Sequence, residues 1–133
     1  MGKLLALDYG TRRVGIAISD ETHSHVFIRK TIDLGSTKKL TVALTELVRV
    51  EDVEKLVFGL PLSLDGSEGP QAASIRAVAT RISSTLRIPV EFEDERYTSS
   101  YADRFKGSSG DRDSIAAAAI LESYLERTAR RTP

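Results

Sequence analysis

The opening segment, residues 4–20 (LLALDYGTRRVGIAISD), constrains the fold more than any other part of the chain. A short apolar run stops at Asp8, a turn follows around Gly10 and Thr11, and a second apolar run occupies residues 14–18. Two such runs joined by a glycine-containing turn predict a pair of antiparallel strands. The first strand would end in a carboxylate at the rim of a sheet, and the role of that carboxylate depends on whether other acids join it.

The apolar periodicity of the remaining chain predicts alternating helices and strands. The expected strands are 3–8, 14–19, 26–32, 54–59 and 89–94. The expected helices are 71–86, 98–105, 113–128 and a first helix that begins at Ser36 or Thr37 and ends near residue 50. Short links make the first three strands an antiparallel meander, whereas helical crossovers make the last two parallel to the first. We therefore expect a single α/β domain over residues 1–133, with a five-stranded mixed sheet flanked by helices.

Composition narrows the possible functions. The chain has 19 basic and 19 acidic residues and no cysteine, which excludes disulfides and thiolate metal sites. Zero net charge argues against a broad basic surface for nucleic acid, although bound cations can offset a cluster of acids. We see neither a signal peptide nor a membrane span, so we expect a cytoplasmic protein without a membrane partner. His23 and His25 are expected to be solvated loop residues rather than metal ligands.

Acidic residues stand at the ends of two strands that should be parallel. Ligands bind beyond the carboxyl ends of the parallel strands in open sheets, so Asp8, Gly59 and the Asp94–Glu95 pair should converge there. Strand alternation puts Asp94 on the same face as the apolar side chains of its strand, which favours Asp94 over Glu95 as the partner of Asp8. If the strand ends or bends at Asp94, alternation does not decide between them.

Asp113 stands just ahead of an alanine-rich run. An Asp in this position commonly caps a helix, but the small side chains would also let the helix lie close to the sheet and bring Asp113 near Asp8. Three converging carboxylates without cysteine form an oxygen site suited to Mg²⁺ or Mn²⁺, and a cation keeps the like charges ionised. Two such ions can activate water and stabilise the leaving oxygen of a phosphodiester.

Other interpretations of Asp8 stay open. An acid before a glycine turn is often only a turn former that bonds its own backbone. The pattern D-x-G-T is also the first phosphate-binding signature of actin-like sugar kinases and ATPases. Those proteins need two such lobes around a nucleotide, and a chain of 133 residues has room for one.

Four blocks together resemble the YqgF/RuvX family and cover about half of the chain in the family's order: LALDYGTRRVGIAISD, VFGLPLSLDGSEGPQA, FEDERYTSSYA and DSIAAAAILESYLE. The resemblance implies a ribonuclease H-like fold and a nuclease that matures the 5′ end of the small-subunit ribosomal RNA precursor. The family was earlier proposed to resolve Holliday junctions. The resemblance also implies a catalytic, metal-binding triad of Asp8, Glu95 and Asp113, with Asp94 as the alternative to Glu95.

The resemblance assigns further roles. Gly10, Thr11 and Arg13 would hold a phosphate or support the first turn, and Gly59, Pro61 and Gly66 would shape the loop beside the site. Arg96, Thr98 and Ser99 could contact the nucleic-acid backbone, although Arg96 could equally pair with Asp94 or Glu95.

The segment 106–112 departs from the family, whose members usually carry a longer, lysine-rich segment there. This departure puts the substrate class in question more than the chemistry. The expected partner is nucleic acid, most of all precursor ribosomal RNA. A resolvase of four-way DNA junctions and a non-catalytic RNA-binding ribosome-assembly factor are the alternatives. The oligomeric state stays open.

Overall fold

The computed structural model describes residues 2–34, 37–108 and 110–129. Of the two expected starts of the first helix, Ser36 lies outside these ranges and Thr37 is the first residue of α1. The elements follow the predicted order: β1 (Lys3–Tyr9), β2 (Arg13–Ser19), β3 (Val26–Asp33), α1 (Thr37–Glu51), β4 (Val53–Leu60), α2 (Pro70–Leu86), β5 (Val90–Asp94), η1 (Glu95–Tyr97), α3 (Ser99–Ala102), η2 (Asp103–Phe105) and α4 (Arg112–Ala129). The single helix expected over 98–105 is a short α-helix followed by a 3₁₀ turn.

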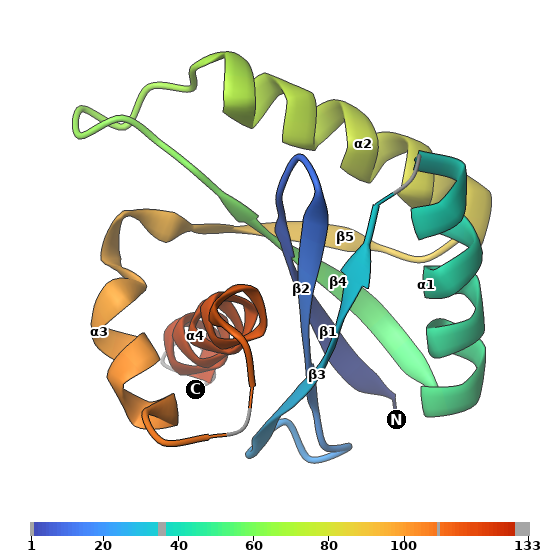
Figure 1. Cartoon of the computed structure of the whole chain (residues 1–133), viewed down its shortest axis with the longest axis horizontal. Helices are drawn as coiled ribbons and strands as arrows, with labels where there is room; N and C mark the ends of the chain where they lie inside the picture. The colour runs from blue at the N-terminus through green and yellow to red at the C-terminus, as the bar shows by residue number, and fades with distance from the viewer. Residues whose placement is uncertain (1, 35–36, 109, 130–133) are drawn as a thin grey trace.

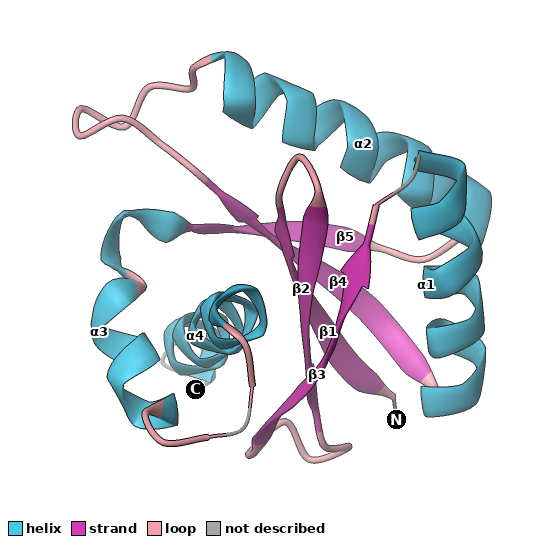
Figure 2. Ribbon diagram, viewed as in Figure 1, coloured by secondary structure: helices cyan, strands magenta, loops and turns pink. Residues whose placement is uncertain are grey.

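The five strands form one mixed sheet in the order β3-β2-β1-β4-β5 (Figure 2). β1, β2 and β3 pair antiparallel, while β4 and β5 run parallel to β1. The predicted fold class is therefore confirmed. Because β1 is the central strand, its carboxyl end lies at the middle of the rim where the parallel strands finish.

Helices cover both faces of this sheet. α1 and α2 pack on one face, and α4, with α3 beside it, packs on the other (Figure 1). Alternation along β1 sends Leu5 and Leu7 into the core under α1 and α2, and Leu4 and Ala6 into the core under α4. The same alternation places Asp8 on the α4 face.

α4 lies close to the sheet. Ala117 and Ala118 are fully buried in the core that α4 shares with β1, β2 and β4. Near the start of the helix, Gly15 of β2 faces the backbone of Asp113, and a Cβ at this glycine would collide with the carbonyl oxygen of Asp113. Gly15 is also the strand partner of Asp8. The small residues therefore bring the first turn of α4 to the end of β1.

Within the ranges that the structure describes, no helix has the length and apolar character needed to cross a membrane.

Candidate active site

Asp8 and Glu95 form a hydrogen-bonded carboxyl pair at the end of β1. Burial of both side chains and the charge of Asp8 raise the pKa of Glu95 to about 7. Burial likewise raises the pKa of Asp8, while the hydrogen bond from Glu95 opposes that rise. The hydrogen bond lowers the pKa of Asp8 and raises that of Glu95, which favours Glu95 as the donor to the Asp8 carboxylate. Two acids in such contact need either a proton or a cation between them.

Glu95 reaches Asp8 across β4, over a glycine. A Cβ at Gly59 would collide with Ile120 and would lie 2.9 Å from the Glu95 carboxyl carbon. Gly59 follows Val57 by two residues, so it faces α4, as does Asp8. The glycine therefore leaves the space in which the two carboxyl groups meet.

Strand alternation favours Asp94 only if Asp8 lies on the face of the apolar side chains of β5, and it lies on the other face. The apolar side chains of β5 face α2, but Asp8 lies on the α4 face. Glu91 accepts a hydrogen bond from the Tyr124 hydroxyl of α4 at 2.9 Å, and Glu93 accepts one from Ser123 at 2.6 Å. Glu95 continues that series of glutamates. Glu95 begins η1, one residue beyond the end of β5, so alternation within the strand does not decide between the two acids, and the contact with Asp8 identifies Glu95 as the partner.

Asp94 has a different role. One of its oxygens accepts from the Arg96 backbone N–H at 2.9 Å and caps the 3₁₀ turn η1. Its other oxygen lies 2.7 Å from Nη2 of Arg96, and this ion pair holds the pKa of Asp94 below its ordinary value. The structure thus brings Glu95 to Asp8 and engages Asp94 elsewhere.

Asp113 approaches the pair from the first turn of α4. The helix cap is Asp111, whose Oδ1 accepts from the Ser114 backbone N–H at 2.9 Å, so the expectation that Asp113 caps the helix is wrong. Asp113 is near enough for its charge to raise the pKa of Asp8. Its Oδ2 lies 3.4 Å from Nε of Arg13, a side chain that is 58% exposed.

The three acids are neighbours, but their carboxylates do not converge on one metal position. Over residues 2–34, 37–108 and 110–129, no group of three or more His, Cys, Asp or Glu side chains is arranged to hold a metal ion. Asp8 and Glu95 are in contact, and the ion pair with Arg13 holds the carboxylate of Asp113. Asp113 therefore stands beside the Asp8–Glu95 pair with an exposed arginine as its ion-pair partner.

The other residues singled out in the sequence surround this pair. The Gly10 N–H donates to the Arg13 carbonyl at 3.0 Å and closes the β1–β2 turn, where Thr11 is exposed. Thr98 is buried, and its hydroxyl donates to the Glu95 carbonyl at 3.2 Å, so it supports Glu95. Ser99 is exposed at the start of α3.

Arg96 joins the site to the β4–α2 loop. Its Nη1 donates to the Leu64 carbonyl at 3.2 Å, and Gly66, with φ +87°, lies against its guanidinium. Pro61 begins this loop just after β4. The ion pair with Asp94, foreseen as one alternative for Arg96, is the contact that the structure contains.

Sequence reasoning did not identify Gly15 and Asp111 as parts of this arrangement. Gly15 interrupts an otherwise apolar strand, and a glycine inside a strand often marks the close approach of another backbone. The segment Asp111-Arg112-Asp113 offers two possible caps two residues apart, and only the observed start of the helix separates them.

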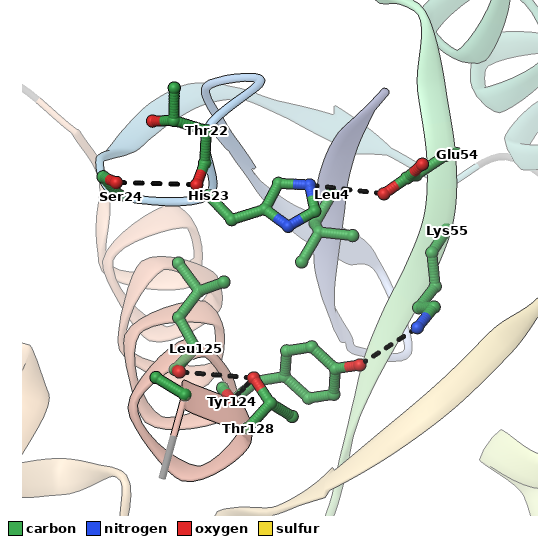
Figure 3. A pocket seen from close by; sticks show the side chains of 10 residues that line it. Leu4, Thr22, His23, Ser24, Glu54, Lys55, Tyr124, Leu125 and Thr128 are labelled. Atoms are coloured by element: carbon green, nitrogen blue, oxygen red, sulfur yellow. Dashed lines mark hydrogen bonds and ion pairs between the residues drawn. The ribbon is translucent and has the colours of Figure 1, made fainter. Parts of the chain in front are cut away.

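A pocket lies away from these acids, at the other end of the sheet (Figure 3). It has a volume of about 470 Å³ and lies between Leu4 at the start of β1, the β2–β3 turn and the end of α4. The charged side chains that line it have partners: Glu54 lies 3.3 Å from Nε2 of His23, and Lys55 contacts Glu91 and Tyr124. The pocket therefore presents no free charge comparable to the acids around Asp8.

Some known proteins are similar to this chain in sequence, and others are similar to it in fold. A protein of Chloroflexus aurantiacus named "Putative pre-16S rRNA nuclease" is 37% identical to this chain, and the match covers 92% of this chain and 86% of that protein. A protein of the same name from Caldanaerobacter subterraneus is 39% identical, and the match covers 93% of this chain and 96% of that protein. RuvC of T. thermophilus, solved with a Holliday junction substrate, superposes with a TM-score of 0.75 at 8% identity, covering 99% of this chain and 98% of RuvC. The Fowlpox virus resolvase, solved with junction DNA, gives a TM-score of 0.57 at 12% identity, covering 95% and 98%.

The structural likeness identifies the sheet and its helices as a ribonuclease H-like fold. The family model RuvX, described as Holliday junction resolvase, matches residues 2–127. The chain belongs to the RuvX family.

Proposed function

We propose that the protein is a divalent-metal-dependent nuclease whose site consists of Asp8, Glu95 and Asp113. The observation that carries this proposal is the Asp8–Glu95 pair. The two acids are partly buried and hydrogen-bonded to each other at the rim of a ribonuclease H-like fold. Such a pair costs free energy in an ordinary structural role. It is useful where a cation replaces the shared proton.

The donor set suits Mg²⁺ or Mn²⁺. All three side chains offer carboxylate oxygens, which these hard cations prefer. Asp8 and Glu95 would supply the first ligands, and Asp113 a third once it leaves Arg13. When bound, the metal supplies an activated water and stabilises charge on the phosphate oxygens.

The chain itself positions the substrate. Arg13, freed from Asp113, can pair with a phosphate oxygen by a charge-assisted hydrogen bond. The exposed β1–β2 turn around Gly10 and Thr11 can approach the same strand. Glu95 gives up its proton when the site is loaded, while the buried hydroxyl of Thr98 keeps its backbone in place.

Precursor ribosomal RNA is the substrate that we favour, because the relatives that match nearly the whole chain are named for it. A protein that processes this RNA in a bacterium would act in the cytoplasm. The description of the family model supports a four-way DNA junction as the second candidate.

The test compares cleavage of precursor ribosomal RNA, a four-way DNA junction and an unstructured single strand in Mg²⁺ and in Mn²⁺. Asp8→Asn should reduce metal-dependent cleavage at least about 100-fold with the fold intact, since it removes charge at the centre of the site. Asp52→Asn is the matched control: Asp52 is exposed just before β4 and has φ +54°, which Asn tolerates. Undiminished cleavage by purified Asp8→Asn would overturn the site assignment.

A further inference from the structure

Tyr97 is an exposed aromatic residue beside the candidate active site. Among the residues that the structure describes, the large apolar or aromatic side chains with high exposure are Phe27, Val42, Val50, Leu64 and Tyr97, and Tyr97 is 67% exposed. It follows Glu95 by two residues, so their Cα atoms lie within about 7.6 Å of each other. An exposed ring this close to the two acids lies within reach of a substrate that is bound at them.

The ring is held in place. Tyr97 ends η1, which Asp94 caps through the Arg96 backbone, and the Thr98 N–H donates to the Glu95 carbonyl at 3.3 Å. The Arg96 guanidinium carbon lies 5.2 Å from the centre of the Tyr97 ring. Because Arg96 is bound to Asp94 and to the Leu64 carbonyl, it gives the ring a fixed support. A preorganised ring loses little conformational entropy when it binds.

The space beside the ring suits a neutral, flat group. Tyr97 lines a pocket of about 310 Å³ with Glu93, Asp94, Tyr101, Ser123 and Arg127. The charges in that pocket are paired, Asp94 with Arg96 at 2.7 Å and Glu93 with Arg127 at 2.8 Å. A phosphate would meet no free cation among these residues, whereas a base can stack on a tyrosine.

The charge balance of the chain points to the same ligand. Proteins that bind nucleic acid through phosphates alone carry an excess of basic residues, and this chain has none, with 19 of each sign. Stacking of bases on aromatic side chains is an uncharged source of affinity and requires that the base be unpaired.

We propose that Tyr97 is a stacking platform for an unpaired nucleobase next to the scissile phosphate. The protein then selects strands that are unpaired at the cleavage position. This inference rests on the proposed nuclease function for the position of the phosphate, but its test does not depend on cleavage.

The test measures equilibrium binding in EDTA, where metal-dependent cleavage cannot occur. The probes are a short unstructured RNA that carries 2-aminopurine, a base whose fluorescence reports stacking, and the same RNA in a full duplex. Tyr97→Leu should weaken binding of the unpaired RNA about tenfold and abolish the fluorescence change, and should leave duplex binding unaltered. Tyr97→Phe keeps the ring and should bind as the wild type does.

Phe27→Leu is the matched control. Phe27 is also an exposed aromatic residue, 47% exposed, but it lies on β3 at the opposite edge of the sheet from β5. Its loss should change neither probe. The proposal is overturned if Tyr97→Leu binds the unpaired RNA like the wild type, or if it weakens unpaired and duplex RNA equally. It is also overturned if the substitution changes only self-association of the protein, which would make the ring part of a protein interface. Absence of cleavage in metal, with the stacking result intact, would refute the nuclease function and leave the platform standing.

Discussion

Glu95 lies against Asp8 in surroundings that disfavour two negative charges. Burial is the largest cause of its raised pKa, followed by the charge of Asp8. Folding therefore favours the protonated form of Glu95 until a cation replaces the proton. This single side chain links the stability of the protein to both pH and metal.

The stability of the metal-free protein should therefore fall across neutral pH. The folded pKa of Glu95, about 7, lies above its ordinary value of 4.5, so its contribution is fully present below about pH 4.5 and is lost as the pH rises through 7. Glu95→Gln cannot ionise and should not show this loss. Thermal melting in EDTA between pH 4.5 and 8 should show the Tm of the wild type falling relative to that of the variant.

Added Mg²⁺ supplies the control for this experiment. At pH 8 it should restore the Tm of the wild type, because the cation binds the deprotonated pair, and it should do less at pH 5, where protons compete. Melting curves of the wild type and Glu95→Gln that stay parallel over the whole pH range would contradict the assigned proton.

At the scale of elements, the position of α4 depends on the absence of a side chain in β2. A Cβ at Gly15 would overlap the backbone carbonyl of Asp113, and a backbone atom cannot swing away as a flexible side chain can. Gly15→Ala should therefore push the first turn of α4 outward, destabilise the protein by about 1–3 kcal/mol and weaken Mn²⁺ binding by moving Asp113. Urea unfolding and metal titration measure the two effects.

Gly69→Ala is the comparison for Gly15→Ala. A Cβ at Gly69 meets no atom within 4 Å, so the substitution only replaces a favourable N-cap residue of α2. It should lower the free energy of unfolding by less than about 1 kcal/mol. If both variants lost the same free energy of unfolding, the packing of α4 against Gly15 would not be tight.

The order of the elements could be predicted from sequence because apolar periodicity is a local signal. The partner of Asp8 could not be derived from alternation. β1 is apolar on both faces, since Leu4 and Leu5 are both buried, and nothing within the strand tells which face carries Asp8. The family resemblance selected Glu95. Physically, the choice depends on where α4 packs, which involves residues more than 90 positions away from Asp8.

The cap of α4 was ambiguous for a similar reason. Asp111 and Asp113 are equally good caps in isolation, and the contact that distinguishes them is distant in sequence. Thr31 of β3 donates to Asp111 at 2.7 Å and fixes it at the helix start. Local pattern thus predicted the elements and the rim, and tertiary packing decided which acid of each neighbouring pair faces the site.

At the scale of the whole molecule, the neutral chain makes its electrostatics local. Many basic side chains are paired, for example Arg104 with Glu122 at 2.9 Å and with Glu126 at 3.1 Å. Arg12 lies in the β1–β2 turn, Arg13 begins β2 and Arg112 begins α4, and all three are exposed. The charge of Arg112 reaches Asp8, where it opposes the rise in pKa. These three arginines are exposed cations near the rim that a phosphate backbone could contact.

Binding of unpaired RNA should consequently depend only weakly on salt. Each phosphate contact on a single strand contributes about −0.7 to the slope of log K against log salt concentration, so three arginines give a slope of about −2. Arg12→Gln should make the slope shallower by about 0.7, whereas Arg104→Gln, which removes an arginine already paired with acids of α4, should leave it unchanged. Anisotropy titrations in EDTA across a range of KCl concentrations measure these slopes. A slope as steep as about −5 is typical of a broad basic surface. It would mean that ion pairs of the free protein break when RNA binds, and that phosphate contacts contribute more to the affinity than stacking on Tyr97.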